Sequence, residues 1–229
     1  SNQLGAEITA YGARAVDAEE QERREDQHAA VGADEQAQEG LGKIDILINN
    51  AGVVLKPTIM DAEEAHWDAT MNINLRAPYL LSRNIAGRMI ENEQAAVILH
   101  NTSIHAANSV QYFSAYAASK AALESLARVQ ALEWAPYNIR VNCFAPGVVP
   151  VERTQQGLEA AKDQWMPHMP LGRYGAGEDI AQLALFLSSD ASAWTTGQSY
   201  VADGGMLARM DMPRRARPEP PPEPDPVED

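Results

Sequence analysis

The chain has 229 residues, of which 45% are hydrophobic, and this is enough for the core of one sizeable α/β domain. Its formal net charge of -14 excludes nucleic acid as a partner, because proteins that bind nucleic acid concentrate Lys and Arg on one face. The single cysteine, Cys143, excludes an internal disulfide framework and a cysteine-based metal cluster.

Cys143 and the N-terminal sequence give information about the cellular location of the protein. Cys143 lies in the apolar run at residues 141–145, which predicts a buried thiol. No apolar stretch is long enough to cross a membrane, and the N-terminus lacks the pattern of a signal peptide. We therefore expect a cytoplasmic protein with no membrane partner.

Strands and helices are predicted to alternate along the chain. Residues 1–42 are charged and rich in Gln, and we expect helix with loops there. The first strand is predicted at residues 44–48, a run rich in Ile that ends at Asn49-Asn50-Ala51-Gly52. The elements predicted after it are a long helix at 62–90, a strand at 96–99, a long helix at 114–135, a strand at 139–144, a helix ending near Trp165, a helix at 178–187 and a short strand at 199–201.

This order of elements predicts the fold class. Strands that alternate with helices of this length indicate a mostly parallel sheet covered by helices on both faces, a three-layer α/β fold of Rossmann type. We expect one domain at residues 1–208. Residues 209–229 are rich in Pro, Glu and Arg without apolar periodicity, and they predict a flexible tail, with partner binding as the alternative.

Tyr116 and Lys120 are the first candidates for catalysis. They lie four residues apart in a predicted helix, so their side chains share one face. A phenol with a pKa near 10 is a poor acid-base catalyst at neutral pH, and a close ammonium group lowers that pKa by favouring the phenolate. The spacing alone is a weak pattern, because an isolated match is usually an exposed helix face.

The surrounding motifs make the pair specific. Ser103 lies thirteen residues before Tyr116, just after a predicted strand, and with Asn74, Tyr116 and Lys120 it resembles the Asn-Ser-Tyr-Lys tetrad of short-chain dehydrogenases/reductases. The resemblance extends from about residue 42 to residue 205. It includes, in matching order, the segments at residues 49–52, 138–142, 146–147, 170–173, 178–181, 196–198 and 203–205.

The resemblance implies a role for each member of the tetrad. Tyr116 protonates a ketone or deprotonates an alcohol, Ser103 hydrogen-bonds the same oxygen, and Lys120 holds the nicotinamide ribose and lowers the tyrosine pKa. Asn74 holds a water that connects Lys120 to solvent. The alternatives are a helix-kink or packing residue for Asn74 and a turn hydroxyl at a strand end for Ser103.

The same resemblance implies a site for NAD or NADP. Asn49, Ala51 and Gly52 border the adenosine half of the cofactor, where a side chain at Gly52 would crowd the nucleotide. At the nicotinamide end the implied contacts are Pro146, Gly147 and Val149. The family often has Thr five residues after this Pro, whereas this chain has Val151 there and Thr154 slightly later.

Two further features lie on the substrate side. His105 follows Ser103 by two residues and is expected to line the substrate site, with a solvated loop histidine as the alternative. Residues 148–169, rich in Met, Trp and Pro, correspond to the family's substrate lid, with a plain surface helix as the alternative.

The glycine-rich turn that meets the pyrophosphate is missing before Asn49. Compared with the family, the sequence starts roughly forty residues late, judged against the usual size of the first unit. Two explanations remain open: the sequence is a piece of a complete enzyme, which we favour, or it is a shortened member that has lost cofactor binding. Without the preceding strand, the edge at residues 44–48 and an apolar face would be exposed.

These patterns favour an NAD(P)-dependent oxidoreductase that interconverts a secondary alcohol and a ketone by hydride transfer. The segments at residues 103–106 and 151–154 resemble sugar and polyol dehydrogenases, and an acyl-carrier or general ketone reductase is the competing class. The alternative of another kind is a non-catalytic binding or scaffold subunit. Because the family packs its long helices against a second subunit, a homodimer or homotetramer is expected.

Overall fold

The computed structural model describes residues 43–208, in which four parallel strands form one sheet. The strands are β1 (Ile46–Asn49), β2 (Ala96–Asn101), β3 (Ile139–Pro146) and β4 (Ser199–Ala202), and they lie side by side in chain order. Ile46 pairs with Val97, Ala96 with Ile139, and Cys143 with Ser199. Each connection between neighbouring strands therefore crosses over a face of the sheet, as parallel pairing requires.

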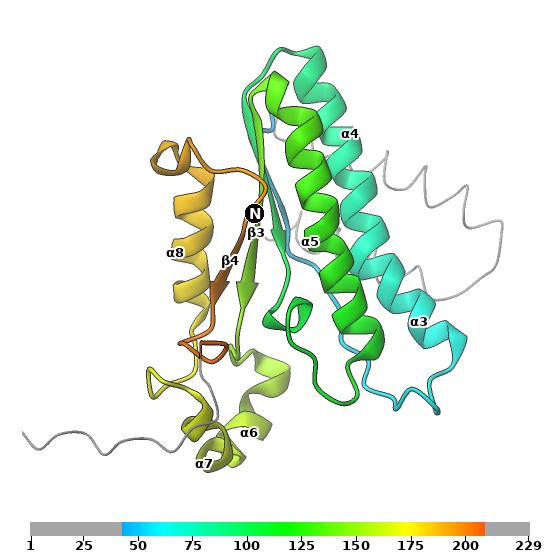
Figure 1. Cartoon of the computed structure of the whole chain (residues 1–229), viewed down its shortest axis with the longest axis vertical. Helices are drawn as coiled ribbons and strands as arrows, with labels where there is room; N and C mark the ends of the chain where they lie inside the picture. Colours follow the sequence, from blue (N-terminus) through cyan, green and yellow to red (C-terminus); the bar gives the residue numbers. More distant parts are fainter. Residues whose placement is uncertain (1–42, 209–229) are drawn as a thin grey trace, which may run out of the picture.

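Helices cover the sheet from both sides (Figure 1). One layer contains α3 (Glu64–Met71), α4 (Ala77–Glu91) and α5 (Ser114–Trp134), and the opposite layer contains α8 (Gly177–Ser188). The short helices α6 (Glu152–Ala160) and α7 (Lys162–Trp165) lie at the end toward which the strands point. Single turns lie at η2 (Ile104–Ala106), η3 (Ala135–Tyr137), η4 (Met166–His168) and η5 (Asp190–Ser192). The predicted three-layer α/β class is confirmed.

The core is divided by the sheet into two clusters. Alternate side chains of β2 point to opposite faces, so Ile98 packs toward α4 and α5 while Leu99 packs toward α8. The larger cluster also takes Met89 from α4 and Ala127 from α5. Cys143 belongs to it and is 1% exposed, so the predicted burial of the thiol is confirmed.

The first strand has one covered face. Leu47 is buried under α4, whereas Ile46 and Ile48, on the other face, are 46% and 42% exposed. The strand begins two residues later than predicted and includes Asn49, which pairs with His100. Among residues 43–208, this apolar face of β1 is therefore only partly covered.

The helix predicted at residues 62–90 is interrupted by a π-helical turn. The turn, η1 (Asn72–Arg76), lies between α3 and α4, and the N–H of Ala77 bonds to the carbonyl of Asn72, five residues back. Pro78 is the second residue of α4 and has no N–H to donate to the carbonyl of Asn74, which explains why the regular helical ladder is interrupted here. This turn places Asn74 where its side chain faces the site.

The other predicted elements agree with the structure to within two residues at most boundaries. The helix predicted at residues 114–135 is α5, which ends where Pro136 blocks a further turn and Asn138 turns the chain at φ 59°. The expectations for residues 1–42 and for the tail at 209–229 lie outside the described residues. Within residues 43–208 no helix is both long and apolar enough to cross a membrane, and no three His, Cys, Asp or Glu side chains are grouped to hold a metal.

Candidate active site

The candidate residues gather at the carboxyl ends of the strands. Gly52 follows β1, Ser103 follows β2, Gly147 follows β3, and Tyr116 lies in the first turn of α5. In open parallel sheets this end is where loops from neighbouring strands converge on a ligand. The fold thus brings together residues that are up to ninety-five positions apart in the sequence.

Tyr116 stands in a cluster of three rings. Its ring centroid is 5.7 Å from that of Phe113 and 6.2 Å from that of His105, both in edge-on arrangements. Ser103 is buried, and its hydroxyl accepts a hydrogen bond of 3.2 Å from the backbone N–H of His105, which starts the turn η2. The serine hydroxyl therefore bonds within the turn after β2, which is its alternative role, and it also lies beside Tyr116.

The pKa of Tyr116 differs from the prediction. Burial of the phenol raises its pKa, while the Ser103 hydroxyl and the positive charge of Arg153 oppose the rise. The prediction that Lys120 lowers this pKa is wrong for the net effect, because desolvation of the phenolate outweighs the favourable contacts. Tyr116 is therefore a protonated acid at neutral pH.

Lys120 is a buried ammonium group next to Tyr116. Its Nζ lies 5.7 Å from the centroid of the Tyr116 ring and donates a hydrogen bond of 2.7 Å to the carbonyl of Asn101. Burial lowers the pKa of Lys120 to about 8, so the group is close to titrating at neutral pH. Within residues 43–208 this is its one hydrogen bond to the protein, so two of its three N–H bonds are left for a ligand.

Asn74 fixes the loop after β1 against α5. Its Oδ1 accepts from the N–H of Val53 at 2.8 Å, and its Nδ2 donates to the carbonyl of Val53 at 2.9 Å and to Ser119 Oγ at 3.1 Å. Ser119 in turn donates to the carbonyl of Tyr116 at 2.7 Å. The packing alternative for Asn74 is thus supported, and the implied water relay stays a prediction.

Gly52 lies where two polar side chains meet. A Cβ atom added there would lie 3.4 Å from Asn74 Oδ1 and 3.4 Å from Lys120 Nζ. The glycine therefore keeps open the space around the ammonium group. Space left by a missing Cβ beside a cation with free donors fits a hydroxyl-rich ligand such as a ribose.

Asn49 is directed into the molecule. It is 7% exposed, and its Nδ2 donates to Ser82 Oγ at 3.0 Å and lies 3.2 Å from His100 Nδ1. His100 Nε2 lies 2.8 Å from Gln130 Oε1, which completes a buried polar network between the sheet and the helices α4 and α5. Cofactor contact through the Asn49 side chain stays a prediction, because the structure shows this side chain bonded inside the protein.

The segment that leaves β3 is fixed by close packing. A Cβ atom at Gly147 would lie 2.7 Å from both Cα and Cβ of Asp203, and one at Gly175 would lie 2.9 Å from Val149 Cγ2. Pro146 is the last residue of β3, and its position there brings this segment to the same end of the sheet as Ala51. Thr154 bonds to the backbone N–H of Val151 at 3.0 Å, so its hydroxyl caps α6.

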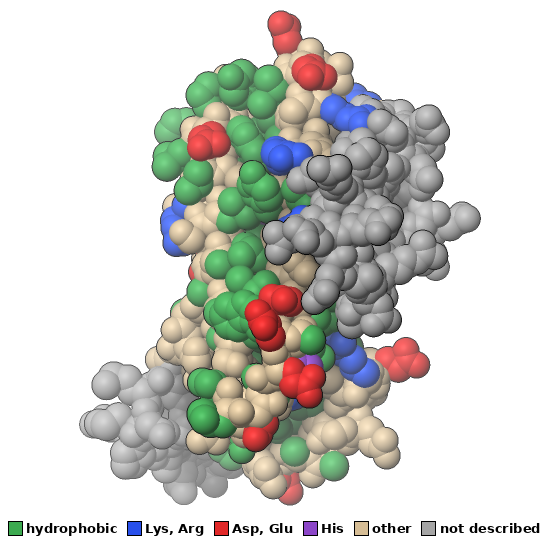
Figure 2. Space-filling view, turned by 90° about the vertical axis from the view of Figure 1, so that its right-hand side faces the viewer, with side chains coloured by type: hydrophobic (Ala, Val, Ile, Leu, Met, Phe, Trp, Pro, Cys, Tyr) green, Lys and Arg blue, Asp and Glu red, His purple; other side chains and the backbone are tan. Residues whose placement is uncertain are grey.

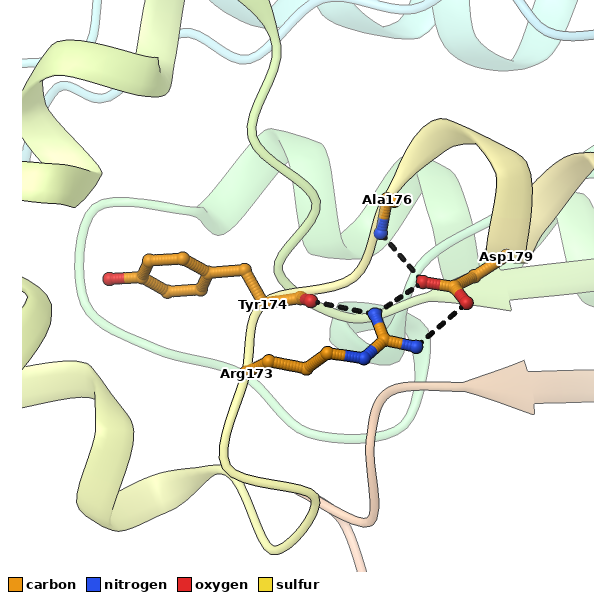
Figure 3. A network of polar contacts seen from close by, with 4 residues as sticks. All are labelled: Arg173, Tyr174, Ala176 and Asp179. Atoms are coloured by element: carbon orange, nitrogen blue, oxygen red, sulfur yellow. Dashed lines mark hydrogen bonds and ion pairs between the residues drawn. The ribbon is translucent and has the colours of Figure 1, made fainter.

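A brace that the sequence did not reveal holds the segment at residues 148–169, whose role as a substrate lid stays a prediction. Tyr174 Oη donates to the carbonyl of Leu158 in α6 at 2.8 Å. Arg173 binds both carboxylate oxygens of Asp179, at 2.6 and 2.8 Å, and the N–H of Ala176 donates to the same carboxylate at 2.7 Å (Figure 3). Arg173 therefore holds the pKa of Asp179 far below its usual range. The sequence showed these residues only as family motifs, without their contacts.

His105 lies in the ring cluster around Tyr116. It is half-buried, its Nδ1 is 3.1 Å from the carbonyl of Asn108, and its ring packs 4.8 Å from Phe113. The ring contact with Tyr116 places it beside the candidate catalytic residue. A role in substrate binding stays a prediction.

Comparison with known proteins supports the family and the fold. A family model described as "Enoyl-(Acyl carrier protein) reductase" matches residues 3–207. The chain is 35% identical over 178 residues to 2-dehydro-3-deoxy-D-gluconate 5-dehydrogenase of Dickeya dadantii, covering 76% of this chain and 70% of that protein. It is 39% identical over 164 residues to NAD-dependent glycerol dehydrogenase of Listeria innocua, covering 71% of this chain and 64% of that protein.

A solved structure shows the same arrangement with a cofactor. It is described as a 2-deoxy-D-gluconate 3-dehydrogenase from Agrobacterium tumefaciens with bound NADP; its TM-score is 0.70, its identity is 32%, and the match covers 72% of this chain and 68% of that one. The fold and the relatives define an α/β oxidoreductase that uses NAD or NADP. The chain belongs to the short-chain dehydrogenase/reductase family.

Proposed function

We propose that Tyr116, Ser103, Lys120 and Asn74 are the residues that interconvert a secondary alcohol and a ketone, with a sugar-like or polyol-like compound as substrate. The observation that carries this proposal is their convergence: Tyr116 lies beside Ser103, Lys120 lies beneath Tyr116, and Asn74 joins the helix of both to the loop after β1. The relatives named for gluconate derivatives and glycerol support the substrate class.

The residues present fit the nicotinamide half of a cofactor. Lys120 has two N–H bonds left, and Gly52 leaves room beside them. NAD or NADP would supply or accept the hydride when bound. Lys120 would bind the ribose hydroxyls, and the segment at residues 146–149 would border the nicotinamide.

The protein's own part of the reaction is the movement of one proton. In ketone reduction the Tyr116 phenol donates its proton to the carbonyl oxygen, while the Ser103 hydroxyl hydrogen-bonds that oxygen as charge develops on it. The raised pKa of Tyr116 keeps the proton on the phenol until the substrate accepts it. In alcohol oxidation the same proton returns, and Lys120 stabilises the phenolate that takes it up.

Titration with each cofactor tests the proposal directly. We expect the nicotinamide fluorescence of NADH or NADPH to change on binding the chain. Tyr116→Phe is expected to bind the same cofactor but to lose turnover by about 100-fold or more, the usual contribution of a positioned acid. Full turnover by Tyr116→Phe would refute the assigned role, and binding of neither cofactor would favour a non-catalytic scaffold.

A second subunit is proposed on the helical face. Met71, Leu75, Tyr79 and Leu126 line a shallow hollow of about 410 Å³ between η1, α4 and α5. Figure 2 shows hydrophobic side chains gathered on this side of the molecule. An apolar surface of this kind on two long helices fits a symmetric helix-to-helix dimer, or half of a tetramer.

A cytoplasmic location is also part of the proposal, supported by a lone cysteine that is buried rather than bridged.

A further inference from the structure

The turn of α5 that carries Tyr116 has no side-chain cap. Helix α5 begins at Ser114, and the preceding Phe113 makes no capping hydrogen bond to the first N–H groups of the helix. Tyr116 is the third residue of this helix. The first turn of an α-helix has N–H groups without partners inside the helix, and such ends open most readily. A catalytic phenol in this turn therefore needs contacts from outside the turn to fix its position.

Ser119 makes such a contact. Its Oγ donates a hydrogen bond of 2.7 Å to the carbonyl of Tyr116 and accepts one of 3.1 Å from Asn74 Nδ2. Ser119 and Asn74 are both fully buried, so water does not compete for these hydrogen bonds. A hydroxyl group can donate and accept at the same time, and Ser119 uses both capacities to join α5 to the π-helical turn η1.

The hydrogen bonds continue from Asn74 to the loop after β1. Asn74 Oδ1 accepts from the N–H of Val53 at 2.8 Å, and Nδ2 donates to the carbonyl of Val53 at 2.9 Å. The Nδ2 group has two hydrogens, and Val53 and Ser119 use both of them. The backbone next to Gly52, which borders the proposed cofactor site, is thus joined through two buried side chains to the backbone of Tyr116.

We propose that Ser119 is a positioning residue, whose hydroxyl fixes the turn that carries Tyr116 relative to the loop after β1. This inference rests on the function proposed above and deepens it, because it concerns the placement of the same tyrosine. Ser119 takes no part in the proton transfer itself. It acts through Tyr116, by holding the phenol where the substrate oxygen can accept its proton.

The variant Ser119→Ala tests the role of the hydroxyl. It removes both hydrogen bonds, and Ala is the residue that helices favour most, so the helix itself is kept. We expect kcat to fall about tenfold or more, which is the cost of a displaced catalytic group. The Kd for NADH or NADPH, measured by nicotinamide fluorescence, is expected to stay unchanged, because Lys120 keeps its hydrogen bond to the carbonyl of Asn101. A raised Kd with unchanged kcat would contradict the proposal.

Ser188→Ala is the matched control. Ser188 Oγ donates to the carbonyl of Ala184 at 2.7 Å, which is the same kind of bond at the same length, in α8 on the opposite face of the sheet. Each variant is expected to lower Tm by about 2–4 °C for its lost hydroxyl bond, and only Ser119→Ala is expected to lower kcat. Equal kcat losses in the two variants overturn the inference. Full turnover by Tyr116→Phe would instead refute the proposed function.

Amide hydrogen exchange of the full chain gives a readout that needs no turnover. The N–H of Ala117 belongs to the same peptide group as the carbonyl of Tyr116, and it bonds to the carbonyl of Phe113 at 2.7 Å. In Ser119→Ala this N–H is expected to exchange about tenfold faster, because the turn opens more often, whereas Ser188→Ala should leave its exchange unchanged. Equal exchange in Ser119→Ala and the wild type overturns the inference, whether or not the chain oxidises a substrate.

Discussion

At Tyr116 and Lys120, burial acts on two neighbouring groups in the same direction, toward the neutral form. It raises the pKa of the phenol and lowers that of the ammonium group to about 8. The sequence predicted which two residues meet, because a spacing of four fixes a shared helix face. It could not predict the balance of their charges, because desolvation depends on how deeply the tertiary structure buries the pair.

The pH dependence of ketone reduction follows from these two pKa values. Reduction needs a protonated Tyr116, and the raised pKa of Tyr116 keeps the phenol protonated at neutral pH. Reduction also needs a charged Lys120, and Lys120 is mostly charged below its pKa of about 8. We expect kcat/KM for reduction to fall about tenfold per pH unit above that value. Arg keeps its charge at higher pH, so an active Lys120→Arg variant should show a kcat/KM for reduction that stays constant above pH 8. A wild-type profile that is flat to pH 9 would contradict the role of Lys120.

His100 is a residue whose importance only the fold reveals. In the sequence it is one histidine at the end of a predicted strand. In the structure it is fully buried, with Asn49 donating toward Nδ1 and Gln130 accepting from Nε2, an assignment that requires the neutral ring. Burial lowers the pKa of His100 to about 4, against the bond to Gln130, which raises it.

Acid should therefore weaken the fold through His100. In the unfolded chain His100 has a pKa near 6.5, whereas in the folded chain its pKa is about 4. Between these two pH values the unfolded chain binds a proton that the folded chain does not. The contribution of the neutral ring to the free energy of unfolding is therefore complete above pH 6.5 and is lost as the pH falls toward 4. We expect the wild type to lose about 2 kcal/mol more than His100→Gln between pH 7 and pH 5. Urea unfolding at the two pH values measures this difference, and equal losses in both proteins would contradict it.

At the scale of elements, local pattern predicted where helices and strands lie but not where they deviate. The run at residues 62–90 has one continuous apolar face, so it predicts one helix. The π-helical turn inside it arises because Pro78 has no N–H to donate to the backbone hydrogen bonds of the helix, an effect that the apolar pattern does not reveal. The brace formed by Arg173, Tyr174 and Asp179 links α8 to α6 through contacts that no local pattern encodes. Such contacts arise only once both helices are placed on the sheet.

The junction of β3 and β4 gives an element-scale prediction. A methyl group at Gly147 would lie 2.7 Å from two Asp203 atoms, a contact that requires the strand ends to separate. We expect Gly147→Ala to destabilise the protein by about 1–3 kcal/mol and to lower activity, because the same segment borders the proposed nicotinamide site. Thermal unfolding and turnover check both effects.

Gly87→Ala is the matched control for Gly147→Ala. A Cβ at Gly87 meets nothing within 4 Å, and the residue lies inside α4, where Ala is favoured over Gly. This variant should be stabilised by up to about 1 kcal/mol with unchanged turnover. A Gly147→Ala protein as stable as Gly87→Ala would show that the strand ends are free to move apart.

At the scale of the molecule, the alternation of elements predicted a three-layer fold, because parallel strands need crossover connections and parallel sheets are typically covered by helices on both faces. The sequence placed Ser103 just after a strand, and the structure shows that Ser103 and Tyr116 lie at the carboxyl end of the sheet.

Assembly is the last property that the structure makes testable. The hollow lined by Tyr79 and Leu126 on α4 and α5 is apolar, and a carboxylate placed in it would be desolvated without a partner in a dimer. We expect Leu126→Glu to shift the protein toward monomer in size-exclusion chromatography with light scattering. Leu185→Glu, on α8 in the opposite layer, is the matched control, because Leu185 is 63% exposed. If Leu185→Glu alone produced monomer, the subunits would meet through α8, and a monomeric wild type would remove the proposed interface altogether.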